Sequence, residues 1–565
     1  MTRHARRPER LPTPPPRQIR FSSSAVRYNG DSTIYALSTA PGRGAIAIIR
    51  ISGPACLDIY RSLCPGKNDP KPRYATVRTL YEPNAPATPS SVLDSGALVL
   101  YFPAPKTVTG EDLLELHVHG GTAIVRAVLA AIPSISSADS PTSSIIRYAE
   151  PGEFTRRAFA NDRLDLTQVE ALGDSLAAST EQQRRLSVRG TTNSLATRYE
   201  CWRSHLLAAR GELEALIDFS EDQHFDESIA ELLGSVAAQI GSLRASLRAH
   251  RENAVRGELL RSGISLALLG APNAGKSSLL NAVVGREAAI VSRQAGTTRD
   301  VVEVGIDLGG FLCRLGDTAG LRKALADGEG GDVVGLVERE GMRRAKARAE
   351  ESDVVVVVLS LEHEYGGKGK AVVQLDAEVV KTAARLVADK DNVLVVINKI
   401  DVIQDSGDLE EAIAAVQQAI PGLASEKIHP ISCTTTEPTN TAASSPNSIQ
   451  LFLRALITQF ATLTSAISPE SSEESDPSIW QESLGASERH RLLLEACIAS
   501  LEDFTALVSA AAEEADAGDG EADIVLAAEH LREAGDALAR ITGRGEAGDV
   551  EEVLGVVFEK FCVGK

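Results

Sequence analysis

The chain has 565 residues, of which 43% are hydrophobic and 24% charged, and its formal net charge is −19. A chain of this length exceeds a single hydrophobic core and predicts about two to four domains. The negative charge argues against a protein that grips nucleic acid mainly through a basic surface of its own. No apolar run approaches the length of a membrane span, so no membrane association is expected. The seven cysteines form no CxxC pair, which argues against a zinc ribbon or a disulfide scaffold.

Residues 1–30 differ from the rest of the chain. They are rich in arginine, contain the serine run Ser22–Ser24, and hold only Glu9 as an acid before Asp31. This composition predicts a mitochondrial transit peptide and therefore a location in the mitochondrial matrix. The alternative is a disordered basic tail, because the prolines between residues 12 and 16 would interrupt an amphipathic helix.

Residues 31–150 predict an N-terminal α+β domain. Short strand-like runs at 45–51, 97–101 and 113–119 are separated by proline and glycine turns. Residues 131–144 are rich in serine, proline and alanine and are expected to form a loop insertion.

Two helical segments, 151–258 and 482–565, flank an α/β segment. In the first, Thr167 and Glu170 fit a capping box at a helix start. Neither segment is expected to fold alone, so we predict that they pack together as one split helical domain; two separate helical regions remain the alternative. Residues 464–481, acidic and rich in serine, are expected to form a linker.

Between the helical segments, residues 259–463 predict an inserted P-loop GTPase domain. Strand-like runs at 264–269, 353–359 and 393–397 alternate with helical stretches, which indicates a mostly parallel sheet.

A phosphate-binding loop follows the first of these strands. Residues 270–277 satisfy GxxxxGK[ST] between a strand and a helix, where backbone N–H groups cradle phosphates. Lys276 is expected to pair with the β- and γ-phosphates and Ser277 to ligate Mg²⁺. The predicted nucleotide contacts in this loop are Asn273, Ala274, Gly275, Lys276, Ser277 and Ser278.

A second motif predicts selectivity for guanine. Asn398, Lys399 and Asp401 follow the strand 393–397, and an aspartate there can accept hydrogen bonds from guanine N1–H and the 2-amino group, which adenine cannot offer. Ser432 and Cys433 are expected to complete the base pocket.

Two further segments predict the γ-phosphate side of the site. Asp317 and Gly320 end a strand where a carboxylate can hold Mg²⁺ through water and the backbone can approach the phosphate. Residues 296–300, with the adjacent hydroxyls Thr297 and Thr298, lie where a switch loop brings a hydroxyl to Mg²⁺.

The hydrolytic machinery is not that of Ras. The residue after Gly320 is Leu321, which cannot orient water as a glutamine would. Glu338 is a candidate carboxylate, although these residues alone favour a solvated helix face at that position.

Taken together, these motifs resemble those of the MnmE (TrmE) family of tRNA-modifying GTPases, over nearly the whole chain after residue 30. The P-loop version and the segments 285–291, 296–300 and 317–322 are similar to the family's. More specific are the runs at 33–36, 42–53, 109–116, 119–121, 151–159, 161–166 and the terminal Phe-Cys-Val-Gly-Lys at 561–565.

The resemblance implies three domains, of which the first binds a tetrahydrofolate derivative of the 5-formyl or methylene type. It implies a homodimer that acts with an FAD-dependent partner of the MnmG (GidA, Mto) type on carbon 5 of the wobble uridine of tRNA. In mitochondria the product is carboxymethylaminomethyl- or taurinomethyluridine. The matching folate positions are Arg50, Glu115, Lys565 and Arg163, where bacterial members have lysine. Cys562 has two readings, a thiol with a chemical role beside the folate or a packed residue that shapes the pocket.

For the GTPase domain, the resemblance implies dimerisation that depends on potassium in place of an arginine finger. The matching K⁺ positions are Asn273, Ser292, Gln294 and Thr297, and Ser277 and Thr298 match Mg²⁺ ligands. Glu338 matches the glutamate that orients the attacking water, which makes it the expected catalytic residue with Lys276.

Other interpretations stay open on sequence alone. A ribosome-assembly GTPase of the Era or Der type shares the nucleotide motifs, and a scaffold switched by GTP binding alone is a third possibility. His117 and His119 share one strand face, but without a third ligand a packing or hydrogen-bonding role is expected over a metal pair.

Overall fold

The computed structural model describes residues 32–135, 145–192, 194–219, 229–286, 289–293, 304–315, 343, 345–363, 370–403, 406–434, 448–468, 477–517 and 523–544. These residues form two compact units, one up to Arg163 and one from Leu164 onward. The proposed transit peptide lies outside the described residues, and the domain boundaries given above stay predictions. Among the described residues, no helix is long and apolar enough to cross a membrane.

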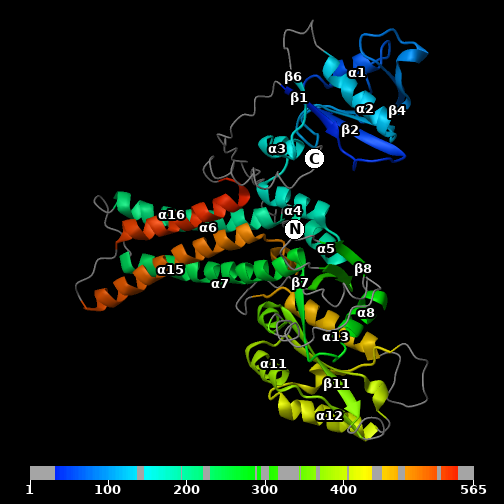
Figure 1. Ribbon diagram of the computed structural model, residues 1–565. Helices are drawn as coiled ribbons and strands as arrows, with labels where there is room; N and C mark the ends of the chain where they lie inside the picture. The colour runs from blue at the N-terminus through cyan, green and yellow to red at the C-terminus, as the bar shows by residue number, and fades with distance from the viewer. Residues whose placement is uncertain are drawn as a thin grey trace, which may run out of the picture. The chain divides into compact units, whose positions relative to one another are not determined.

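The first unit is built on a six-stranded sheet in the order β3-β4-β5-β2-β1-β6 (Figure 1). All neighbouring strands are antiparallel except β1 and β6. Helices α1 and α2 pack on the face where Ile49, Ile51, Leu116 and Val118 are buried. The elements are β1 (Ser32–Leu37), β2 (Ile46–Ser52), α1 (Cys56–Leu63), β3 (Thr76–Tyr81), β4 (Val92–Phe102), β5 (Leu113–His119), α2 (Thr122–Ala131), β6 (Ile145–Tyr148) and α3 (Glu153–Ala160).

The predicted strands of this unit are present, and β5 has the expected bounds. In each strand, alternate side chains point away from α1 and α2, so one face of the sheet carries polar groups of β2 and β5. Helix α3 lies in this unit. It is held there by the buried Arg157, whose guanidinium contacts Glu111 and donates to the carbonyl of Ser32.

The helical part begins with α4 (Leu166–Ala177), and the predicted cap of this helix is wrong. The cap lies two residues earlier: Asp165 accepts from the backbone N–H of Gln168, and the Gln168 side chain accepts from Asp165 N. Thr167 is buried inside the first turn. Glu170 instead pairs with Arg489 and His490, far along the chain, and this partnership cannot be seen in a local pattern.

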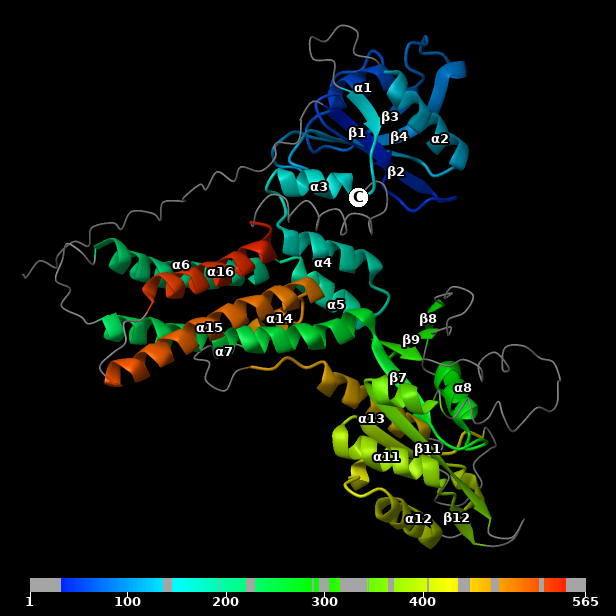
Figure 2. The ribbon, with the colours of Figure 1, turned by 60° about the vertical axis from the view of Figure 1, so that its left-hand side comes forward.

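The two helical segments share one core, which confirms the split helical domain. Helices α6 and α16 lie side by side, as do α7 and α15 (Figure 2). Their contact is made by fully buried apolar side chains, among them Tyr199, Leu247, Leu501 and Leu531. The helices of this part are α5 (Glu181–Gly190), α6 (Ser194–Phe219), α7 (Ile229–Ser262), α14 (Pro477–Ser483), α15 (Glu488–Ala517) and α16 (Ile524–Thr542).

The inserted domain has a sheet in the order β14-β13-β11-β7-β10-β9-β8, with β12 paired to β11. Strands β14, β13, β11, β7 and β10 are parallel to one another, whereas β9 is antiparallel to both of its neighbours, β10 and β8. This arrangement confirms the mostly parallel sheet. The strands are β7 (Ile264–Leu269), β8 (Ala289–Arg293), β9 (Val304–Leu308), β10 (Phe311–Leu315), β11 (Val354–His363), β12 (Ala371–Val373), β13 (Val393–Asn398) and β14 (Ile428–Pro430).

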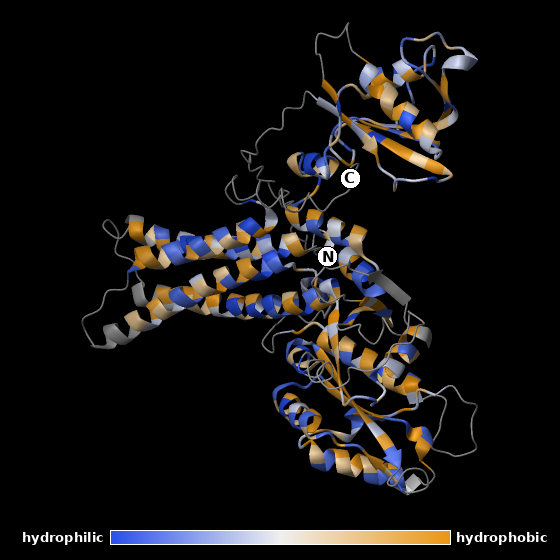
Figure 3. Ribbon diagram, in the orientation of Figure 1, coloured by the Kyte–Doolittle hydropathy of each residue, from blue (hydrophilic) through white to orange (hydrophobic). Residues whose placement is uncertain are grey.

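Both faces of this sheet are covered by helices. The valine run at the start of β11 therefore alternates between two cores, with Val354 and Val356 in one and Val355 and Val357 in the other. Figure 3 shows that the strands of this sheet consist largely of hydrophobic residues. The covering helices are α8 (Lys276–Arg286), α11 (Ala377–Asp389), α12 (Ser406–Ala419) and α13 (Ser448–Leu463).

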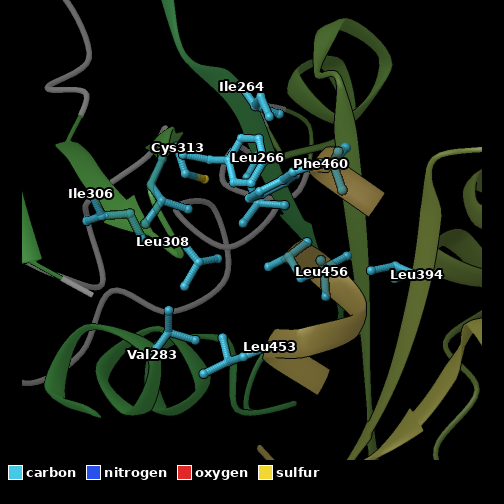
Figure 4. Close-up of a cluster of buried hydrophobic side chains, with 14 of the residues drawn as sticks. Ile264, Leu266, Val283, Ile306, Leu308, Cys313, Leu394, Leu453, Leu456 and Phe460 are labelled. Atoms are coloured by element: carbon cyan, nitrogen blue, oxygen red, sulfur yellow. The ribbon is translucent and has the colours of Figure 1, made fainter. Parts of the chain in front are cut away.

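Figure 4 shows the first of these cores. Leu453, Leu456 and Phe460 of α13 are buried together with Leu266 of β7 and Val283 of α8. Because burying one such side chain contributes roughly 1.5–3 kcal/mol, this core fixes α8 against the sheet and with it the loop that precedes α8.

Two arginines of α7 make hydrogen bonds close to where the inserted domain joins the helical domain. Arg256 donates from one Nη atom to the carbonyls of Thr462, Leu463 and Ser465, where α13 ends. Arg261 bonds to Asp174 of α4, while its own carbonyl accepts from Gln183 of α5. The backbone N–H of Gln182, also in α5, reaches the carbonyl of Gly310 in the turn between β9 and β10.

Candidate nucleotide site

The phosphate-binding loop lies at the carboxyl end of β7 and runs into α8. Its backbone depends on residues that tolerate a left-handed conformation, since Asn273 has φ 61° and Gly275 φ 94°. A side chain at Gly270 is also excluded, because its Cβ would lie 2.4 Å from the carbonyl oxygen of Val358. The conformation of the loop therefore depends on the neighbouring strand β11 as well as on the residues of the loop itself.

The Lys276 side chain is hydrogen-bonded to the start of the phosphate-binding loop. Its ammonium donates to the carbonyl oxygens of Gly270 and Ala271, both at 2.8 Å. Burial lowers the pKa of this lysine, because desolvation disfavours its charged form. A nucleotide phosphate would supply the negative charge that favours the ammonium form.

Ser277 and Ser278 are exposed on the first turn of α8. The N–H groups of a helix start are unpaired within the helix and carry partial positive charge, so this turn suits a phosphate. The Ser277 hydroxyl is accessible there, as a ligand of Mg²⁺ must be.

The second loop, after β13, contacts the first directly. The side-chain amide of Asn398, which is 2% exposed, donates to the carbonyl of Ala274 at 3.0 Å, and its Oδ1 accepts from Lys399 N at 2.8 Å. The sequence predicted both motifs as nucleotide contacts but not this bond between them. It brings the phosphate loop and the base loop to one edge of the sheet.

Asp401 lies where it can face a base. Its Oδ1 accepts from the hydroxyl of Ser432 at 2.6 Å, and the backbone beside it is fixed by a bond from Ile400 N to the Ile431 carbonyl. Ser432 therefore positions the aspartate, a role that the sequence did not predict. Cys433 is partly buried against the core under this edge.

The remaining predicted nucleotide and metal residues cannot be placed. Ser292 lies in β8, of which only the backbone is described. The other predicted contacts of this domain lie outside the described residues, namely Gln294, Thr297, Thr298, Asp317, Gly320 and Glu338.

In the N-terminal unit, two of the predicted folate residues meet. Arg50 and Glu115 face each other across β2 and β5, and Arg50 donates to Glu115 Oε1 from Nε at 3.1 Å and from Nη2 at 2.9 Å. Arg163 donates from Nε to the carbonyl of Thr107, a bond that does not use its two Nη groups. Lys565 and Cys562 lie outside the described residues.

The two histidines of β5 are engaged in hydrogen bonds. His117 Nε2 lies 3.4 Å from Glu115 Oε2, and His119 Nδ1 lies 2.8 Å from Asp94 Oδ1. Within the described ranges, no group of three His, Cys, Asp or Glu side chains is arranged to hold a metal ion. Asp94, on the neighbouring strand, had no signal in the sequence.

Comparison with known proteins gives the same assignment over most of the chain. The family described as GTP-binding protein TrmE N-terminus matches residues 33–163, and the MnmE helical domain matches residues 166–562.

Three curated relatives illustrate the range of the similarity. The tRNA modification GTPase MnmE of Parvibaculum lavamentivorans is 38% identical over 94% of this chain and 100% of its own length. The mitochondrial tRNA modification GTPase mss1 of Schizosaccharomyces pombe is 37% identical over 94% of this chain and 95% of its own. The human mitochondrial 5-taurinomethyluridine-[tRNA] synthase subunit GTPB3 is 36% identical over 99% of this chain and 98% of its own. The two nucleotide loops are thus held within a chain that belongs, from its N-terminal sheet to its last helices, to the MnmE (TrmE) family of tRNA modification GTPases.

Proposed function

We propose that this GTPase drives modification of carbon 5 of the wobble uridine in mitochondrial tRNA, giving a carboxymethylaminomethyl or taurinomethyl product. The observation that carries the GTP-dependent part is the Asn398–Ala274 bond, since it joins the guanine-selective loop to the phosphate loop. The mitochondrial part is supported by the yeast and human relatives, both named mitochondrial. Residues 1–30 then act as the transit peptide, and the matrix is the site of action.

Hydrolysis would use a cation where other GTPases use an arginine. Asn273 has a left-handed backbone, and its side chain is exposed in the phosphate-binding loop, as a K⁺ ligand there must be. With Ser292, Gln294 and Thr297 it would hold K⁺ between two G domains of a dimer, while Ser277 and Thr298 bind Mg²⁺. A monovalent cation there offsets charge that develops on the phosphates. Glu338 would orient the attacking water, the task that Leu321 cannot perform.

The folate site would lie on the polar face of the N-terminal sheet. The carboxylate of Glu115 can accept two donors from a pterin edge, and the ion pair with Arg50 holds it in place. Arg163, Lys565 and Cys562 would complete the site. A tetrahydrofolate derivative supplies the one-carbon unit, and an FAD-dependent partner of the MnmG type acts with the homodimer on tRNA.

Mass spectrometry of mitochondrial tRNA tests the proposal. Cells that lack the protein should lose the wobble-uridine modification and regain it with the wild-type chain. Rescue with Glu338→Ala should fail, whereas Glu351→Ala, which removes an exposed glutamate elsewhere in the same domain, should rescue fully. Unchanged wobble uridines in the deletion strain would refute the function, and full rescue by Glu338→Ala would favour a scaffold that needs no hydrolysis.

A further inference from the structure

Asp94 is a fully buried carboxylate at the start of β4, held by three hydrogen bonds. Its Oδ1 accepts from Gly96 N at 2.9 Å and lies 2.8 Å from Nδ1 of His119, and its Oδ2 accepts from His119 N at 2.8 Å. Burial alone would raise the pKa of this carboxyl, but the bonds from Gly96 and His119 outweigh it and the pKa is lowered. The side chain is therefore an ionised carboxylate without exposure to water.

The partner of this carboxylate is an exposed imidazole. An ionised carboxylate can only accept, so Nδ1 of His119 carries the hydrogen of this bond, and in a neutral imidazole Nε2 then holds the lone pair. The side chain of His119 is 59% exposed, whereas that of Asp94 is 0% exposed. A buried acid thus fixes the tautomer of a histidine whose basic nitrogen is open to a ligand.

The dyad lies on the polar face of the sheet, together with the proposed folate residues. Glu115, His117 and His119 alternate along β5 with core residues, so all three project from the same face. Glu115 and His119 are four residues apart, which corresponds to about 13 Å along a strand. A reduced folate is long enough to reach from one to the other. On β2, the residue opposite His119 is the exposed Ile46, so no charge opposes the imidazole there.

The His119 ring is one of three hydrogen-bond partners of Asp94. The two backbone N–H bonds to Asp94 already hold the turn at Gly96 and the end of β5, and the His119 ring adds only the third. The ring does not press on Gly96, because even an added Cβ at that glycine would lie 3.6 Å from His119 Cε1, an ordinary van der Waals distance. An exposed imidazole that is hydrogen-bonded to a buried acid is arranged for proton transfer.

We propose that Asp94 and His119 form a proton-accepting site for the one-carbon chemistry on this face, an inference that rests on the proposed folate site. Nε2 of His119 takes a proton from the ammonium group of the amino acid that is to be joined to the one-carbon unit. One N–H bond breaks on the amine and one forms on the imidazole, and no electrons are exchanged with an oxidant. The amine lone pair becomes free to attack the methylene carbon, and the new C–N bond forms as one C–N bond to the folate breaks, with its electron pair left on the folate nitrogen. The Asp94 carboxylate stabilises the imidazolium that results from the proton transfer.

The test uses the full-length protein with its flavin-dependent partner, tRNA, methylenetetrahydrofolate and glycine. His119→Ala should bind 5-formyltetrahydrofolate within about threefold of wild type and hydrolyse GTP normally, but modify tRNA about 100-fold more slowly. Added imidazole should restore much of the rate, because the exposed position leaves room for it. His205→Ala, which removes an exposed histidine of α6, is the matched control and should match wild type with or without imidazole.

Asp94→Asn provides a second test, since an amide can donate to Nδ1 and would favour the wrong tautomer. It should slow modification while ¹⁵N spectra of His119 show the proton moved to Nε2. The other ionisable groups named on this face, Arg50, Glu115 and His117, are unchanged in both variants. Modification at the wild-type rate by His119→Ala would overturn the proposal, as would a loss that imidazole does not rescue. If the wild-type protein binds no folate, the proposed folate site is wrong. The folate-binding measurement therefore distinguishes failure of the folate site from failure of the proton-transfer proposal.

Discussion

The side-chain amide of Asn398 lies where a side chain on residue 275 would begin: a Cβ at Gly275 would be 1.9 Å from Asn398 Nδ2. Asn398 belongs to the loop after β13 and Gly275 to the loop after β7, and the two strands are separated in the sheet by β11. The missing Cβ lets the amide reach the Ala274 carbonyl. The base loop and the phosphate loop are therefore assembled as one piece.

Gly275→Ala should abolish GTP binding. The added methyl group must displace a buried amide, and φ of 94° is unfavourable for alanine. Gly211→Ala in α6 is the matched control, because a Cβ there meets nothing within 4 Å, and it should stabilise the protein by about 0.5–1 kcal/mol. Fluorescent GTP titration and thermal unfolding measure both effects. GTP binding by Gly275→Ala at wild-type affinity would contradict the description of this contact.

Asp401→Asn should change the base that the site accepts. The carboxylate accepts from the guanine 2-amino group, whereas an amide can donate to an oxygen at the same position, as in xanthine. The affinity for GTP should fall about 100-fold or more and that for xanthosine triphosphate should rise, in competition titrations. Ser432→Ala, which removes the hydroxyl that positions Asp401, should weaken GTP binding modestly without changing the preferred base.

Arg256→Ala should loosen the attachment of the inserted domain. The guanidinium satisfies three carbonyls at the end of α13, and hydrogen bonds from a charged donor contribute about 2 kcal/mol. Arg248→Ala is the control on the same helix, since its exposed pair with Glu502 is worth less than about 1 kcal/mol. Urea unfolding gives the two stabilities, and equal losses would contradict the anchoring role.

The helical core should lose stability in acid through His250. Burial lowers the pKa of this histidine to about 3, so that the folded protein stays unprotonated there between pH 6.5 and 3 while the unfolded chain takes up a proton. Stability is present above the unfolded value and falls as pH decreases, by about 2 kcal/mol at pH 5. His250→Phe should flatten unfolding free energy against pH. A control change of the exposed His205 to Gln should keep the wild-type curve.

Much of this molecule could be predicted from local patterns. The parallel strands, the phosphate loop and the guanine motif each occupy a continuous stretch whose spacing is set by backbone geometry. The split helical domain followed from the apolar stripes, since neither half can bury its stripe alone. The cap of α4 was misread because Thr167 and Glu170 fit the pattern as well as Asp165 and Gln168 do.

Contacts between distant segments could not be predicted. Glu170 has its partners in Arg489 and His490, and Asp94 has its partner in His119, on another strand. Such pairs arise from the register of strands and the packing of helices, which no single stretch encodes. The same limit hid the positioning role of Ser432.

The account rests on GTP, bound at this site, being the energy source for tRNA modification. Asp401→Asn allows a direct test in the reconstituted system, with wobble-uridine modification measured by mass spectrometry. The account predicts that the variant modifies tRNA when xanthosine triphosphate is supplied and not when only GTP is supplied. Equal modification by the variant with GTP, or modification with no nucleotide at all, would contradict it.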